Sequence, residues 1–166
     1  MRRFVKISDF FRYDIPCGIK NLIRWFPIIW KDRSWDHRYI YEILRHKLDL
    51  QQKHIRKHKN HEGYEETAQK IELCVNLLDR LLDADYNDIA FRFFYKKWGQ
   101  PEFNWIDKGN GYWQLDIKHP KVLTNEDQLE CDKEFKVYSK REAELEKQDL
   151  DMLFKTMRKH IQTWWD

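Results

Sequence analysis

Apolar residues recur at helical spacing along most of the chain, which predicts a series of amphipathic helices. The first is expected over about residues 14–25, because Pro27 removes a backbone donor and should kink or end the helix there. Further helices are expected over about 34–58 and 64–84. The pattern therefore predicts a mainly α-helical protein.

A β-hairpin interrupts this helical pattern at about residues 103–117. Two short segments of alternating apolar and polar residues, 103–106 and 112–117, flank the sequence Lys-Gly-Asn-Gly, which is typical of a hairpin turn. A helix over 87–98 precedes them, ended by a glycine. Because an isolated two-stranded hairpin is marginal in water, we expect its apolar face to pack on the helices.

The last predicted helix is long, from a capping box at Thr124 and Asp127 to about residue 164. Its middle, residues 139–149, is almost wholly charged, so it should bridge solvent, pair with another chain, or break near Gln148. One small body covers the apolar ends on both sides only if the helix bends. We therefore predict a homodimer through this C-terminal helix.

Composition and charge fit one helical domain, residues 1–166, with two unlike halves. Gly and Pro are scarce, and aromatic residues make up 16% of the chain, which excludes collagen-like and low-complexity proteins. Residues 1–61 carry 15 Lys and Arg against 6 Asp and Glu, whereas residues 62–166 carry 16 against 22. The basic and acidic halves should either pair with each other or leave the surface polarised.

The cysteines and the apolar runs suggest a reducing compartment and no membrane partner. Cys17, Cys74 and Cys131 are far apart and odd in number, so each is expected to be a reduced, buried thiol. The longest apolar run, residues 25–30, is far shorter than the ~20 residues that a membrane span needs. The sequence shows no apolar stretch typical of a signal peptide.

An aromatic and basic block follows the first predicted helix and is the main candidate binding site. Guanidinium and ammonium groups bind phosphates, and tryptophans stack on nucleobases. The alternative is that the tryptophans anchor the core and the charges are solvated. No phosphate-binding glycine loop is present. The candidate ligand-binding residues are Arg24, Trp25, Trp30, Lys31, Arg33, Trp35, His37 and Arg38.

Histidines near residue 58 form a second candidate group. His54 and His58 share a helix face and His61 follows, a spacing that zinc accepts. The neighbouring lysines and arginine oppose a dication, so we expect no metal and no other cofactor. A solvated basic helix end is the alternative interpretation.

Two tryptophans, Trp164 and Trp165, stand near the end of the chain. Exposed indoles are unfavourable in water, so they should dock on an apolar surface. The favoured surface is the protein's own core, and the alternative is a partner.

Two stretches of the sequence, residues 19–36 and 160–166, resemble small proteins encoded by tailed bacteriophages. They read IKNLIRWFPIIWKDRSWD and HIQTWWD. The resemblance implies a product made in the cytoplasm of a bacterial host, and no activity is assigned to these proteins. Phage accessory proteins of this kind often bind host or defence components, and some sequester nucleotide signals.

Together these features lead us to expect a counter-defence binding protein, not an enzyme, that sequesters an anionic nucleotide-type ligand. The first alternative is a nucleic-acid-binding protein using the same basic and aromatic surface. The others are a protein–protein inhibitor of a host factor, using the acidic long helix, and a metal-dependent hydrolase. No Ser-His-Asp or Cys-His arrangement is readable from the sequence.

Overall fold

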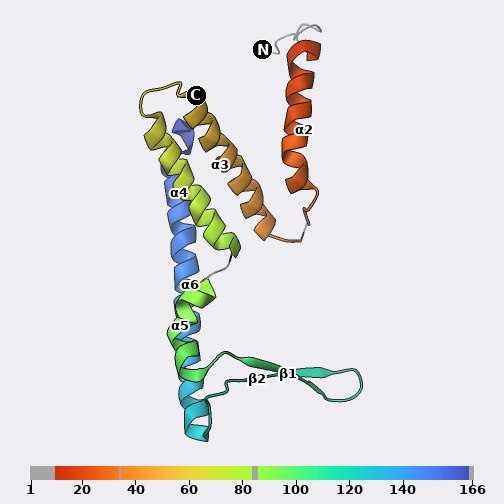
Figure 1. The fold of residues 1–166 in the computed structure, drawn as a ribbon, viewed down its shortest axis with the longest axis vertical. Helices are drawn as coiled ribbons and strands as arrows, with labels where there is room; N and C mark the ends of the chain where they lie inside the picture. The colour runs from red at the N-terminus through yellow and green to blue at the C-terminus, as the bar shows by residue number, and fades with distance from the viewer. Residues whose placement is uncertain (1–9, 34, 84–85, 165–166) are drawn as a thin grey trace.

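The computed structural model describes residues 10–33, 35–83 and 86–164, and it confirms a mainly α-helical fold with one hairpin and a long C-terminal helix (Figure 1). The predicted boundaries hold to within a few residues, and the largest differences are at the end of the first helix, the start of the second and the end of the last. The elements are η1 (Phe10–Asp14), α2 (Ile15–Ile29), α3 (Arg38–His58), α4 (Tyr64–Asp83), α5 (Tyr86–Trp98), β1 (Glu102–Asp107), β2 (Trp113–Lys118), α6 (Asn125–His160) and η2 (Ile161–Thr163).

Helices α3, α4, α5 and α6 form an elongated bundle, which we call the trunk. Helices α4 and α5 follow each other along α6, and α3 packs on α4 (Figure 1). The trunk has two hydrophobic clusters. The first joins α3, α4 and the C-terminal half of α6 around Ile71, Leu78 and Leu153, and the second joins α5 to the N-terminal half of α6 around Phe91 and Phe94.

Helix α6 is continuous from Asn125 to His160, so the predicted break near Gln148 is wrong. The predicted capping box is confirmed: Thr124 Oγ1 accepts from the backbone N–H of Asp127, whose carboxylate accepts from the backbone N–H of Thr124. Both ends of α6 pack on the same chain, because α5 covers the first half and α4 the second. The geometric argument for a second chain is therefore wrong, and the homodimer stays a prediction that light scattering tests.

A polar network holds the charged middle of α6 against the junction of α4 and α5. The carboxylate of Asp149, 6% exposed, accepts from Arg80 Nη2 at 2.7 Å and from the Tyr86 hydroxyl at 2.6 Å. Burial, together with the hydrogen bond to Asp149, raises the pKa of Tyr86. Because Arg80 ends α4 and Tyr86 begins α5, one carboxylate connects three helices at this point.

The hairpin projects from the trunk, and the expectation that its apolar face packs on the helices is wrong (Figure 1). Its strands pair in antiparallel register, with Trp105 opposite Leu115 and Phe103 opposite Ile117, so these four side chains share one exposed face. Among the described residues, the hairpin contacts the trunk at its base. There a Cβ on Gly99, at φ +86°, would lie 2.6 Å from a ring carbon of Pro120, so the turn requires glycine.

Helix α2 stands apart from the trunk (Figure 1) and runs through Pro27 to Ile29, so the expected end near Trp25 is wrong. Pro27 lies in the last turn of α2, so it removes the hydrogen bond to the carbonyl of Ile23 but has no further turn after it to interrupt. The predicted cap at Asp14 makes no side-chain hydrogen bond, because the short π-helix η1 leads directly into α2.

Charge pairing between the two halves of the sequence is concentrated where α3 meets α4. Arg45 pairs with Asp79, and Arg56 Nη2 lies 2.8 Å from Glu72 and 3.2 Å from Glu65. The hydrogen bond from Arg56 holds the pKa of Glu72 below its ordinary value. The basic residues of α2 do not take part in these pairs. Neither do the basic residues on the side of α3 that faces α2.

The cysteines only partly match the expectation of buried thiols. Cys74 and Cys131 are buried, and burial raises the pKa of Cys74 to about 11. Cys17, near the start of α2, is exposed. No helix of the described residues is both long and apolar enough to cross a membrane.

Candidate ligand-binding cleft between α2 and α3

An open cleft of about 470 Å³ lies between α2, α3 and the C-terminal end of the trunk. Its volume is within the ~300–1,000 Å³ range of small-molecule sites. The lining combines cationic, amide and aromatic side chains and contains no carboxylate. The lining residues are Asn21, Arg24, Trp25, Lys47, Leu50, Gln51, His54, Ile55 and Trp164.

One wall of the cleft depends on Trp25, the α2 side chain that reaches α3. Its ring packs edge-on against the ring of His46, with 4.9 Å between centroids and an interplanar angle of 75°. Asn21 is four positions before Trp25 and three before Arg24, so it neighbours both side chains on the surface of α2. The contact of Trp25 with His46 therefore aims the polar side of α2 at α3.

Trp164 lies at the floor of the cleft. It belongs to the first hydrophobic cluster, which confirms that this tryptophan docks on the protein's own core. Trp165 lies outside the described residues. Trp164 is 3% exposed, and its backbone carbonyl accepts a hydrogen bond from the Gln51 amide. Its indole N–H is buried and has no acceptor among the described residues. A buried donor without an acceptor costs about 1–3 kcal/mol. This donor is therefore a group that a ligand acceptor would satisfy.

The cleft is electrostatically one-sided. Arg24 and Lys47 are exposed on opposite walls, and neither forms an ion pair among the described residues. The nearest acid on α3, Asp49, is already engaged by Lys53 Nζ at 2.7 Å. Although burial acts to raise it, the hydrogen bonds from Lys53 and Gln52 hold the pKa of Asp49 below its ordinary value. Among the described residues of the lining, an anion entering the cleft would meet two cations and no carboxylate.

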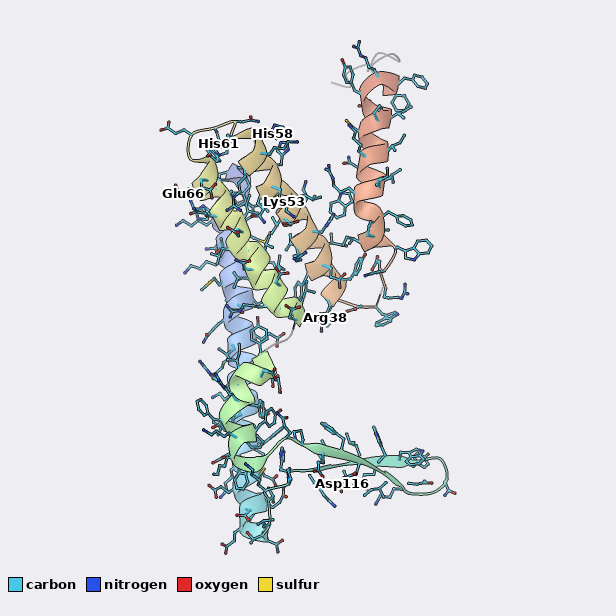
Figure 2. The ribbon with its side chains drawn as sticks, viewed as in Figure 1. Arg38, Lys53, His58, His61, Glu66 and Asp116 are labelled. Atoms are coloured by element: carbon cyan, nitrogen blue, oxygen red, sulfur yellow. The ribbon has the colours of Figure 1, made fainter. Side chains whose placement is uncertain are left out.

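A second, shallower cleft of about 310 Å³ continues along α3 from the first. It shares Arg24, Leu50 and His54 with its neighbour and adds Lys53, Lys57 and His58. The basic surface thus extends from the α2–α3 cleft toward the α3–α4 turn, where Figure 2 shows His58 and His61 near one end of the trunk.

Only two of the eight predicted ligand residues, Arg24 and Trp25, reach the α2–α3 cleft. Three others, Lys31, Arg33 and Trp35, belong to the link between α2 and α3 and point into solvent, with Trp35 80% exposed. The guanidinium of Arg33 donates to the carbonyl of Asp32, its own neighbour.

The remaining predicted residues lie elsewhere on the molecule. Trp30 contacts Phe26 on the outward side of α2, with 5.2 Å between ring centroids. His37 and Arg38 line a different cleft, which also contains Glu142 and Glu146, and Arg38 donates to the carbonyl of Leu82. Glu142 and Glu146 make the cleft around His37 and Arg38 unfavourable for an anion.

The histidine group is divided in the same way. The rings of His54 and His58 are 4.3 Å apart on α3, whereas His61 lies beyond the helix and contacts the hydroxyl of Thr67 at 3.4 Å. Among residues 10–33, 35–83 and 86–164, no group of three or more His, Cys, Asp or Glu side chains could hold a metal ion.

Sequence reasoning missed Lys47, Gln51 and Trp164 as members of the site. Lys47, Gln51 and His54 recur at intervals of four and three, which places them on one polar face of α3, and this signal was available in the sequence. Trp164 carries no such signal, because more than a hundred residues separate it from Gln51.

Comparison of the chain with protein-family models, curated proteins and solved structures finds no match.

Proposed function

We propose that the protein binds and sequesters an anionic ligand with a planar ring, of nucleotide type, in the cleft between α2 and α3. The observation that carries the proposal is the composition of the described lining, which joins two cations without an ion pair among the described residues, two tryptophans and two amides, and includes no carboxylate. A phosphate group binds cationic side chains, and a nucleobase stacks on aromatic rings.

Each part of the lining suits one part of such a ligand. Arg24 provides a planar guanidinium for bidentate contact with a phosphate, and Lys47 provides a second charge across the cleft. Trp25 offers a ring face for stacking, and the amides of Asn21 and Gln51 can read polar base edges. The unsatisfied indole N–H of Trp164 adds one more donor.

The same lining favours binding over conversion. The side chains described around the cleft include no carboxylate, thiol or hydroxyl, which leaves His54 and Lys47 as the groups there that could transfer a proton or attack a ligand. With the resemblance to bacteriophage proteins, this supports the interpretation that the ligand is a nucleotide signal of an infected bacterium, which the protein withholds from its receptor.

Calorimetry with defined probes tests the proposal. The probes are the four ribonucleoside 5′-monophosphates, their 3′,5′-cyclic forms and cyclic dinucleotides. We expect at least one to bind with one site per chain and to be recovered unchanged. Arg24→Ala should weaken binding about 10- to 100-fold, because a charged hydrogen bond contributes about 1.5–3 kcal/mol.

Arg141→Ala is the matched control, because Arg141 is an exposed arginine on α6, distant from the cleft, and its nearest acid is 3.9 Å away. This variant should bind as the unmodified protein does. Equal weakening by both substitutions, or no binding of any probe, would overturn the proposal.

The extension of the basic surface along α3 favours one second candidate, a nucleic-acid-binding protein. That function predicts tight binding of a single-stranded oligonucleotide, with affinity falling steeply as salt rises. Strong oligonucleotide binding without any mononucleotide binding would replace the proposed function by this one.

A further inference from the structure

Helix α2 presents its polar side to α3 and its apolar side to solvent. Arg24, Asn21 and Trp25 line the cleft, whereas the bulky apolar side chains lie on the remaining arc of the helix. At 3.6 residues per turn these side chains cover an arc of about 120°. They are 51–73% exposed, and they are Ile19, Leu22, Ile23, Phe26, Ile29 and Trp30.

We expect an exposed apolar arc of this size to pack against another surface. Isolated exposed apolar residues are ordinary on protein surfaces, but a contiguous patch that spans a whole helix marks an interaction site. The trunk does not supply the cover, because α2 stands apart from it and meets α3 through the opposite side (Figure 1).

The charge around α2 indicates which kind of surface binds the apolar arc. Residues 15–31 contain Lys20, Arg24 and Lys31 but no Asp or Glu, and residues 1–33 carry 8 Lys and Arg against 3 Asp and Glu. Lys20 lies on α2 beside the apolar arc, and Lys31 follows the end of the helix in the link to α3. A surface complementary to α2 is therefore apolar where it meets the arc and anionic where it meets the lysines. The headgroup region of an anionic lipid bilayer has both properties.

The hairpin lacks this combination of an exposed apolar face and a cationic rim. Its exposed face is also apolar, with Phe103 and Trp105 more than half exposed. Strand residues Glu102, Asp107 and Asp116 outnumber the single strand lysine, Lys118, so the hairpin lacks the cationic rim.

We propose that α2 lies in the plane of an anionic lipid surface, with its apolar arc inserted among the headgroups and the trunk held outside. Insertion of ~5–10 Å is typical of such helices and needs no spanning segment. The expectation of no membrane partner rested on the absence of a span, so it does not bear on a helix that lies on the surface. The α2–α3 cleft stays open to water, because it is on the other side of α2.

Vesicle flotation tests this inference. The full chain is mixed with vesicles of phosphatidylcholine alone or of phosphatidylcholine with phosphatidylglycerol. We expect flotation only with the anionic vesicles, and quenching of tryptophan fluorescence by lipids brominated in the acyl chain. Lys20→Gln should weaken binding about fivefold, since one cation near such a surface contributes about 1 kcal/mol.

Two phenylalanines provide a matched pair of variants. Phe26 on α2 is 57% exposed and Phe103 on the hairpin is 60% exposed. Phe26→Asp should abolish flotation, and Phe103→Asp should leave it unchanged, with circular dichroism confirming that both variants keep their helices.

Three outcomes would overturn the inference. The first is no flotation with anionic vesicles. The second is equal binding to neutral vesicles that Phe103→Asp also removes, which identifies general hydrophobic adsorption. The third is a two-chain mass in light scattering that Phe26→Asp reduces to one chain, which identifies a second copy as the cover. None depends on whether the cleft binds a nucleotide.

Discussion

The trunk and the two projecting elements, α2 and the hairpin, are built from similar amphipathic patterns but meet opposite environments. In the trunk, Leu78 and Phe94 are completely buried, whereas Leu22 on α2 and Trp105 on the hairpin are more than 60% exposed. An amphipathic pattern therefore identifies the face of a helix or strand that is apolar, but it does not identify the surface that buries this face.

The physical reason lies in what opposes each apolar face. In the trunk every helix has at least one neighbour along most of its length, so burial of its stripe stabilises the fold at about 25 cal/mol per Å². The projecting elements meet the trunk locally, through residues such as Trp25 of α2 and through the base of the hairpin. Their exposed faces therefore contribute little to folding and are available for binding.

The largest expected effect comes from truncating one phenylalanine in each region. Phe94→Ala should lower the free energy of unfolding by about 3–5 kcal/mol, because it leaves a cavity between α5 and α6. Phe103→Ala, on the hairpin, should change it by no more than about 0.5 kcal/mol. Urea denaturation followed by circular dichroism measures both. A large loss in Phe103→Ala would mean that the hairpin face is covered in solution.

The elements that the sequence predicted well depend on local signals. The helix predicted over 64–84 is observed over Tyr64–Asp83, because its apolar period and its acidic first turn act within the segment. The hairpin was predicted from its Gly-Asn-Gly turn between alternating segments, and in the structure Gly109, Asn110 and Gly111 all adopt positive φ, which these residue types tolerate. Neither signal needs information from the rest of the chain.

The features that could not be predicted depend on residues that are distant in sequence. The charged middle of α6 continues without a break because Asp149 meets Arg80 and Tyr86, more than sixty residues earlier. The candidate cleft likewise brings Arg24 to Trp164. No local pattern encodes such meetings, so the predicted site kept Arg24 and Trp25 together with neighbours that point elsewhere.

An intermediate effect is expected from removing the carboxylate that joins α4, α5 and α6. Asp149→Ala leaves the buried hydroxyl of Tyr86 without its acceptor, which should cost about 1–3 kcal/mol of unfolding free energy. Asp151→Ala, an exposed aspartate two positions on, is the control and should cost almost nothing. Thermal unfolding of both variants distinguishes them. Equal losses would show that Asp149 acts only through helix propensity and not through the network.

The smallest effect concerns acid stability at the α5–α6 contact. The hydrogen bonds from Lys97 Nζ at 2.7 Å and from Trp98 Nε1 at 2.8 Å hold the pKa of Glu134 below its ordinary value. A carboxyl group whose pKa is lower in the folded state stabilises the fold above its unfolded pKa, near 4.3, and loses that contribution as pH falls through the folded pKa.

Glu134→Gln should therefore destabilise the protein at pH 7 by less than about 1 kcal/mol, the range of half-exposed ion pairs, and should make stability less dependent on pH below about 5. Glu146→Gln, an exposed glutamate on the same helix, should follow the unmodified protein at every pH. Urea midpoints measured between pH 7 and pH 3 provide the comparison. The Lys97–Glu134 contact would have no role in acid stability if the two variants lost stability in parallel, because the lowered pKa of Glu134 acts only through a proton that glutamine cannot bind.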